Sequence, residues 1–367
     1  MDNKQIFDQV LSHVPKNLSW MKDHILFLTV HGSIAYGLNT PESDIDLRGI
    51  CTTPKEYLYG FRDKFEQWIL HLPIDSTIFE IKKFFSLTSN NNPNTIEIIF
   101  TNPEDHLYIS PAGQLILDNR NMFLSKQVKE RYIGYAKAQA KRIRSHRNYI
   151  LNPMKSPPSR EEMGLPTQPQ IEKNQFDAVK AMIQKKIESW IPDFEPFTES
   201  QKIYLQNKVS DILAEMEIKS EDKWLAAARS IGLDDNLILV IKQEKEYENK
   251  LEDYRSYCEW KKNRNPKRAA LEEKYRFDLK HATNLVRLLK MGKEILDTGI
   301  VQVKRIHDRE ELMAIKNGAW TYEQLISYAD EIEAEVQESY KNSKLPNQPD
   351  AKSLNALCMK IVEMHLK

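Results

Sequence analysis

The hydrophobic periodicity of this chain changes once, near Gln114, and this change constrains the fold more than any other feature. Before it, short apolar or alternating runs typical of strands occur at Ile25–Val30, at residues 45–50 and at Ser76–Ile81. Ile96–Phe100 fits a strand or the start of a helix. After it, apolar residues recur about every three and a half positions, as in amphipathic helices. With 367 residues and 41% hydrophobic side chains, the chain can fill a sizeable core. We predict an α/β (α+β) domain with a mixed sheet, followed by a mostly helical C-terminal domain.

The cysteines and the N-terminus indicate where such a chain works. Cys51, Cys258 and Cys358 are far apart and form no CxxC pair, so we expect neither a disulfide scaffold nor a structural zinc site. The first ten residues lack the basic start and apolar run of a signal peptide, and no stretch reaches the roughly 20 apolar residues of a membrane span. We therefore expect a cytoplasmic protein without a membrane partner.

Charge is balanced overall but segregated along the chain. The 53 basic and 53 acidic side chains cancel, which argues against general coating of polyanions. Residues 125–155 carry +8 and residues 260–290 carry +7, whereas residues 195–260 and 308–338 carry −6 and −7. Tyr132, Tyr135 and Tyr149 lie among the first basic group, a combination that suits single-stranded RNA, although we expect at least two of them to belong to a helix core. Polyanion binding is thus possible locally.

One segment carries the pattern of a catalytic site. A Gly-Ser turn, Gly32-Ser33, follows the apolar run at residues 25–30, and Asp44 and Asp46 come about a dozen residues later. Residues i and i+2 of a strand point to the same face, so the two carboxylates would lie side by side and repel each other unless a hard cation joins them. Mg²⁺ prefers oxygen ligands and keeps positions for substrate phosphates, which a glycine turn lets approach closely. The alternative is a solvated turn followed by an edge strand with exposed acids.

The motifs GSIAYG and SDIDLRGI resemble the active-site signature of the DNA polymerase β nucleotidyltransferase superfamily. Within it, they are similar to a bacterial and phage family of predicted RNA-repair nucleotidyltransferases. The segment from Asn90 to Glu97 and the segment DLKHA at residues 278–282 also fit that family. The resemblance covers residues 25–105 and 258–325. It implies a catalytic domain at 1–113, a linking basic helix at 114–155, a helical insertion at 156–257 and a helical nucleotide- and acceptor-binding domain at 258–367.

The resemblance also implies roles for individual residues. Asp44 and Asp46 would bind Mg²⁺, with Mn²⁺ as the alternative, and a third carboxylate would complete the site. Asp75 is favoured for that place and Glu80 is the alternative, while Glu97 is expected to pair with Arg48 or to cap a turn. A cationic stripe is expected on a helix at residues 280–294, either for phosphates or as a solvated face. The expected nucleotide contacts are Gly32, Ser33, Tyr36, Arg48, Lys280, His281 and Arg287.

These expectations define a metal-dependent enzyme that transfers NMP from an NTP to a hydroxyl, with an RNA 3′ end as the leading acceptor. A protein hydroxyl or a small molecule is the first alternative, and a non-catalytic nucleotide- or RNA-binding module is the second. The NTP and the oligomeric state stay open at the level of sequence.

Overall fold

The computed structural model describes residues 3–61, 64–169, 171–189, 220–264 and 266–366. The chain divides into two compact units, one formed by residues 1–152 and 266–367 and the other by residues 153–265. The first unit is therefore built from both ends of the chain. The four-part division expected from the sequence stays a prediction.

The first unit contains a five-stranded sheet with the strand order β3-β4-β2-β1-β5. The strands are β1 (Ile25–His31), β2 (Asp46–Cys51), β3 (Gln67–Leu70), β4 (Asp75–Glu80) and β5 (His106–Ile109). Strands β2 and β4 run parallel and the other neighbours are antiparallel, so the sheet is mixed, as predicted. Only β3 and β5, of four residues each, were not anticipated, because such short runs show little alternation.

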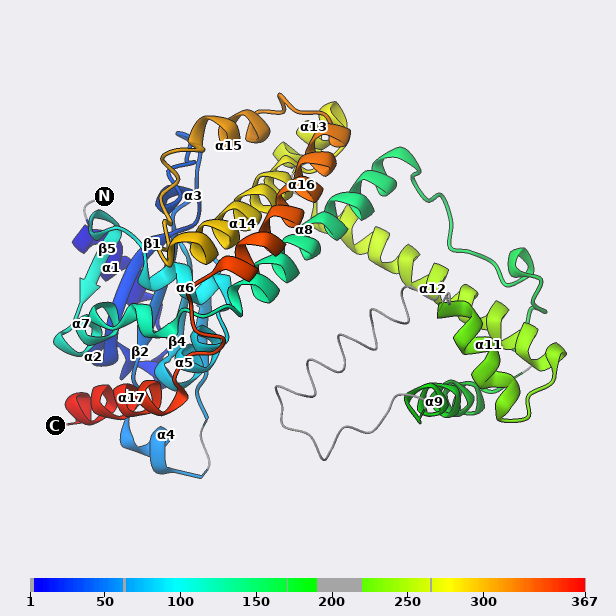
Figure 1. Ribbon diagram of the computed structural model, residues 1–367, viewed down its shortest axis with the longest axis horizontal. Helices are drawn as coiled ribbons and strands as arrows, with labels where there is room; N and C mark the ends of the chain where they lie inside the picture. The colour runs from blue at the N-terminus through cyan, green and yellow to red at the C-terminus, as the bar shows by residue number, and fades with distance from the viewer. Residues whose placement is uncertain (1–2, 62–63, 170, 190–219, 265, 367) are drawn as a thin grey trace. The chain divides into compact units, whose positions relative to one another are not determined.

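Helices cover both faces of the sheet (Figure 1). On one face, α1 (Asn3–Ser12) and α2 (Met21–His24) pack their apolar residues against Leu28, Leu47 and Ile78. The other face is covered by α5 (Ile81–Ser89), α6 (Pro93–Ile99) and α7 (Pro111–Asp118). The sequence predicts either a strand or the start of a helix at residues 96–100, and the structure places most of them in the helix α6. The side chain of Asn92 caps this helix, and Pro93 occupies its first turn.

The helical part of this unit is built around α14 (Leu279–Thr298). This helix packs against α8 (Val128–Leu151), α15 (Arg309–Lys316) and α16 (Tyr322–Asn342), and α13 (Pro266–Tyr275) precedes it. The last helix, α17 (Ala351–Leu366), returns to pack on α5 and α7 (Figure 1, red). One continuous core joins these helices to the sheet, so catalytic and helical parts share their packing. In the parts of the chain that the structure describes, no helix combines the length and the apolar character needed to cross a bilayer.

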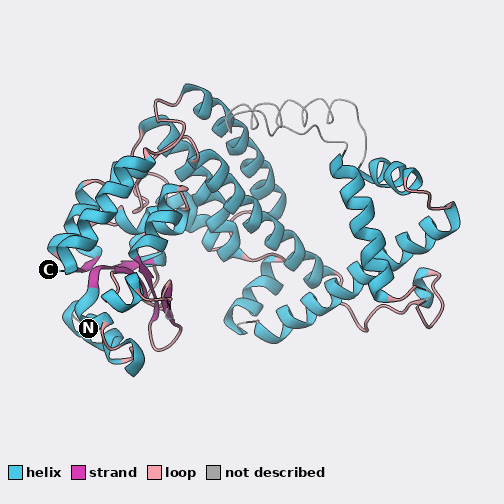
Figure 2. Cartoon of the chain, turned by 90° about the horizontal axis from the view of Figure 1, so that it is seen from below, coloured by secondary structure: helices cyan, strands magenta, loops and turns pink. Residues whose placement is uncertain are grey.

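The regular secondary structure of the second unit is helical in its described residues, and loops join the helices (Figure 2). It contains α9 (Lys173–Ser189), α11 (Ser220–Ser230) and α12 (Asp235–Asn263), with a small core around Ile183, Ala227 and Ile238. The guanidinium of Arg160 binds both carboxylate oxygens of Glu244. The insertion expected at 156–257 lies mostly in this unit, and its residues 190–219 lie outside the described part of the chain.

Candidate active site

The pairing of β2 with β4 brings two of the predicted carboxylates together. Asp46 and Asp75 begin these parallel strands and are direct partners in the ladder. Neighbouring strands lie about 4.8 Å apart, so the two side chains start from adjacent positions on one face. Asp44 lies two residues before the start of β2 and is exposed. The three acids therefore meet at one end of the strand pair.

Gly32 lies against this cluster, directly after β1. Its φ is +64°, and a Cβ at this position would lie 2.0 Å from Oδ2 of Asp46. An L side chain would therefore be strained by its backbone and would collide with the carboxylate. The glycine of the Gly-Ser turn is required by the position of Asp46, and Ser33 follows it in the short helix α3 (Gly32–Ala35).

The positive charges near Asp46 do not fully offset the burial of its carboxyl and the repulsion from neighbouring carboxylates. Burial raises the pKa of its carboxyl, the Arg48 guanidinium opposes that shift, and the carboxylates of Asp75 and Asp44 add to it. Nη1 of Arg48 donates a hydrogen bond of 2.9 Å to Oδ1 of Asp75. Three converging carboxylates with one arginine carry a net negative charge, and oxygen donors are what Mg²⁺ and Mn²⁺ prefer. The donor set fits a divalent cation.

Glu80 lies far from this cluster. It is the ladder partner of Cys51, at the opposite end of β2, and five residues of strand separate it from Asp75, which is about 16 Å at the usual rise. Its Oε2 accepts a hydrogen bond of 3.0 Å from the backbone N–H of Lys83 and caps α5. The structure thus brings Asp75, and not Glu80, to Asp46.

A cavity of about 760 Å³ opens beside Asp44 and Asp46. This volume lies within the usual range of small-molecule sites. The sheet, α3, α8 and α14 all contribute to its walls, so it lies where the catalytic and helical parts meet. Besides Asp44 and Asp46, six of the predicted nucleotide contacts line it, namely Gly32, Ser33, Tyr36, Arg48, Lys280 and Arg287, whereas Asp75 is not among its lining residues.

Lys316 is a lining residue that the sequence did not reveal. Burial and the nearby charge of Lys280 lower the pKa of its ammonium, which donates to the backbone carbonyl of Leu38. Two lysines therefore converge on one cavity and repel each other, an arrangement that an anionic ligand would relieve. The last turn of α15 carried no recognisable motif, because Lys316 reaches the cavity through the packing of α15 on α14.

Glu97 and Arg287 form a buried ion pair, which corrects the expectation that Glu97 pairs with Arg48 or caps a turn. Nη1 of Arg287 donates to Oε1 of Glu97 at 2.8 Å, and the hydroxyl of Tyr36 donates to Oε2 at 2.6 Å. The guanidinium also lies 3.8 Å from the centre of the Tyr36 ring. Glu97 thus pairs with Arg287 and Tyr36, not with Arg48, because α6 faces α14 across the core. Arg287 lines the cavity with its charge already neutralised.

The expected cationic stripe of α14 is not a continuous solvated face, because Arg287 and Lys290 are paired with carboxylates. Lys290 is bound to Glu311, and Arg287 is 5% exposed, whereas Lys280 is exposed and lines the cavity, where its charge acts on the Asp46 carboxylate. His281 does not line the cavity: its Nδ1 lies 2.7 Å from Oε1 of Gln139.

The tyrosines of α8 have separate roles. Tyr132 and Tyr149 are buried, which confirms that at least two belong to the core. Tyr135 is half-buried and lines the cavity.

The sheet, the Gly-Ser turn and the carboxylates lie within a part of the chain that matches a known protein family. Residues 5–154 match the family model described as the RNA repair pathway DNA polymerase beta family. This match confirms the family resemblance of that region. The chain is also 29% identical, over 120 residues, to a protein of Enterobacteria phage T4 described as an uncharacterized 38.9 kDa protein in the nrdC-mobD intergenic region. That similarity covers 30% of this chain and 35% of the phage protein, so the chain matches about a third of its relative's length.

Proposed function

We propose that this protein transfers a nucleoside monophosphate from an NTP to the 3′ hydroxyl of an RNA. Asp44, Asp46 and Asp75 would hold Mg²⁺, or Mn²⁺ in its place. The observation that carries the proposal is the ladder pairing of Asp46 with Asp75, with Gly32 leaving room for the carboxylate. The family match over residues 5–154 supports the same reaction class.

The reaction needs the acceptor oxygen to attack the α-phosphorus, the bond from that phosphorus to the bridging oxygen to break, and pyrophosphate to leave. Bound divalent ions would supply charge neutralisation on the phosphates. Lys280 and Lys316 would bind the negative triphosphate from the helical side of the cavity. Asp75, oriented by Arg48, would accept the proton of the attacking hydroxyl.

The basic surface of α8 supports an RNA acceptor. Lys141, Arg142 and Arg144 are exposed on this helix, and Tyr135 of the same helix lines the cavity. Phosphates attract such cations, and unpaired bases stack on aromatic rings. A 3′ end could thus be held from α8 while its hydroxyl reaches the aspartates.

The test is incubation of the full chain with Mg²⁺, each α-labelled NTP in turn and an RNA with a free 3′ hydroxyl. We expect label to move to the RNA, and RNA with a blocked 3′ end to remain unlabelled. The variants Asp46→Asn and Asp75→Asn should lose the transfer, whereas Asp118→Asn, an exposed acid of α7, should keep it.

Two results would contradict the proposal. Full transfer by Asp46→Asn would remove the aspartates from the mechanism. Label that moves to protein but never to RNA would replace the RNA acceptor by a protein hydroxyl.

A further inference from the structure

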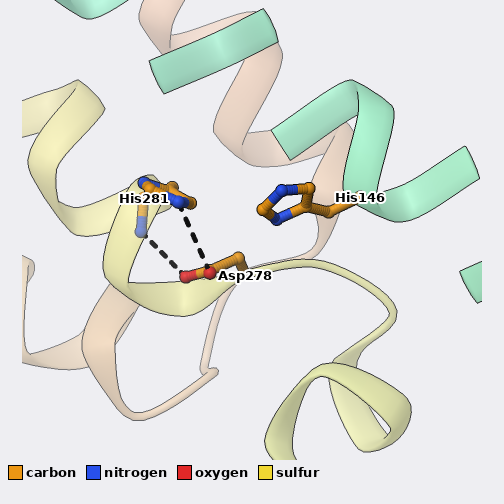
Figure 3. Close-up of side chains that lie close together, drawn as sticks. All are labelled: His146, Asp278 and His281. Atoms are coloured by element: carbon orange, nitrogen blue, oxygen red, sulfur yellow. Dashed lines mark hydrogen bonds and ion pairs between the residues drawn. The ribbon is translucent and has the colours of Figure 1, made fainter. Parts of the chain in front are cut away.

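Three metal-ligating side chains gather where α8 meets the start of α14 (Figure 3). His146 comes from α8, Asp278 is the N-cap residue of α14, and His281 lies in the first turn of that helix. One ligand atom of each residue lies within 4.8 Å of the other two. None of the three belongs to the carboxylate cluster of Asp44, Asp46 and Asp75.

The hydrogen bonds around His281 fix which ring nitrogen faces Asp278. Oε1 of Gln139 can only accept, so Nδ1 of His281 donates to it over 2.7 Å. In the neutral ring, Nε2 then carries a lone pair, and it lies 3.7 Å from Oδ2 of Asp278. The other oxygen, Oδ1, accepts the backbone N–H of His281. In this tautomer, Nε2 of His281 and a carboxylate oxygen of Asp278 can both serve as ligands of one metal ion.

His146 brings a third ligand atom to this cluster. Its ring centre lies 5.6 Å from that of His281, and one of its ring nitrogens lies within 4.8 Å of ligand atoms of His281 and of the buried Asp278. A metal ion would bind all three side chains, whereas a proton shared by one ring and the carboxylate would join only two of them. A metal-binding histidine usually donates a hydrogen bond from its other ring nitrogen to an oxygen atom, as Nδ1 of His281 does to Oε1 of Gln139.

We propose that His146, Asp278 and His281 form a binding site for a borderline divalent transition metal, with Zn²⁺ as the preferred ion. Ligands on a tetrahedral zinc are about 3.4 Å apart, so the three groups need side-chain movements of about 1 Å to close around it. Two imidazoles and one carboxylate suit Zn²⁺ better than Mg²⁺, which prefers oxygen donors. The site contains no cysteine, which is why the cysteine spacing gave no sign of it.

Three protein ligands leave a coordination position for another molecule. Asp278 and Gln139 both line the cavity that contains Asp44 and Asp46. The metal would therefore lie at the wall of this cavity and could bind water or a phosphate oxygen of a ligand there. Metal binding itself does not depend on the proposed nucleotidyl transfer, so the two proposals can fail separately.

The test is a titration of the metal-free full chain with Co²⁺ and Zn²⁺. We expect the visible absorption bands of a low-coordinate site with nitrogen ligands to reach their maximum at one Co²⁺ per chain and to be abolished by one Zn²⁺, whether or not further Co²⁺ binds to the aspartates. Thermal unfolding should shift upward with Zn²⁺, because the ion binds the folded state. His146→Gln and His281→Gln should each weaken Zn²⁺ binding at least tenfold.

Matched variants separate this site from other metal-binding groups. His307→Gln alters an exposed histidine and should bind Zn²⁺ as the unaltered chain does. Asp46→Asn should also keep the Co²⁺ bands, whether or not it transfers nucleotides. Circular dichroism checks that each variant is folded. Absence of micromolar Zn²⁺ binding by the unaltered chain, or unchanged binding by a folded His146→Gln/His281→Gln double variant, would overturn the proposal.

Discussion

Two acidic groups lie near the same cavity, Asp46 in its wall and Glu97 in contact with the wall residues Tyr36 and Arg287, and the protein treats them in opposite ways. Glu97 is buried and shares its two oxygens between Arg287 and Tyr36, so its charge is satisfied inside the protein. Asp46 lies beside two further carboxylates, and burial raises the pKa of its carboxyl. A satisfied charge stabilises the arrangement of elements, whereas an unsatisfied one is available to a ligand. The difference supports a structural role for Glu97 and the proposed ligand-binding role for Asp46.

The largest effect should come from Asp46→Asn. If this site carries the chemistry, kcat/KM for nucleotidyl transfer falls by about 10³-fold or more, which corresponds to about 4 kcal/mol. Stability should be unchanged or higher, because a carboxylate that repels its neighbours has been removed. Transfer kinetics and chemical denaturation measure both effects; a large loss of stability would make Asp46 a structural residue like Glu97.

Glu97→Ala should show the reverse pattern. It leaves the buried guanidinium of Arg287 without its anionic partner, and breaking such a pair costs roughly 3–5 kcal/mol of unfolding free energy. The double variant Glu97→Ala/Arg287→Met should lose less than the sum of the single variants, since no orphaned charge remains. Additive losses in chemical denaturation would show that the two residues do not act as a pair.

Gly32→Ala tests whether space beside Asp46 is essential. The new Cβ meets the carboxylate, so we expect transfer to fall at least tenfold along with a stability loss of about 1–2 kcal/mol from the positive φ. Gly232→Ala is the matched control, because Gly232 has a φ of +87° with no atom within 4 Å of a built Cβ. Equal activity losses in the two variants would rule out the steric explanation.

Lys316→Met should act on binding more than on the chemical step. Removing one of two converging lysines should raise KM for the NTP about tenfold, or about 1.4 kcal/mol, with little change in kcat. Lys344→Met changes an exposed lysine elsewhere in the same unit and should leave both constants unchanged. A fall in kcat at constant KM would instead give Lys316 a role in the transition state.

The smallest effect that we expect is on the pH dependence of stability, and it comes from a pair of histidines away from the cavity. Nε2 of His365 in α17 lies 3.0 Å from Nδ1 of His24 in α2. Burial lowers the pKa of both rings, and His365 lowers that of His24 further, against the opposing charges of Asp23 and Glu56. Because the folded pKa values lie below the unfolded value of 6.5, this contribution to stability is complete above that pH. This stabilisation is lost as the pH falls through the lower pKa values that the two histidines have in the folded protein.

Thermal unfolding between pH 8 and pH 5 measures this dependence. The His24→Gln/His365→Gln variant should show a flatter profile over that range. An identical slope in the variant would assign the acid sensitivity to other groups.

Local patterns were enough to predict much of the first hundred residues. The apolar run ending at His31, the Gly-Ser turn and the two aspartates gave β1, β2 and the position of the carboxylates, because strand alternation and turn chemistry are encoded by neighbours in the chain. The same patterns favoured Asp75 without settling the choice, since Asp75 and Glu80 lie on one strand and only the register with β2 separates them.

Contacts between distant segments could not be predicted in this way. The partner of Glu97 lies 190 residues away in α14, and Lys316 reaches the cavity because α15 packs against that helix. The two histidines and the aspartate at the start of α14 likewise meet only because α8 lies beside it.

The sequence by itself determined the strands β1, β2 and β4, the change to helices after about residue 114, the Gly-Ser turn and the presence of two adjacent aspartates, because these depend on residues close together in the chain. The tertiary structure decided which third carboxylate joins them, which arginine is neutralised and which lysines stay available. These outcomes depend on the strand register and on helix packing, which place side chains from both ends of the chain around one cavity.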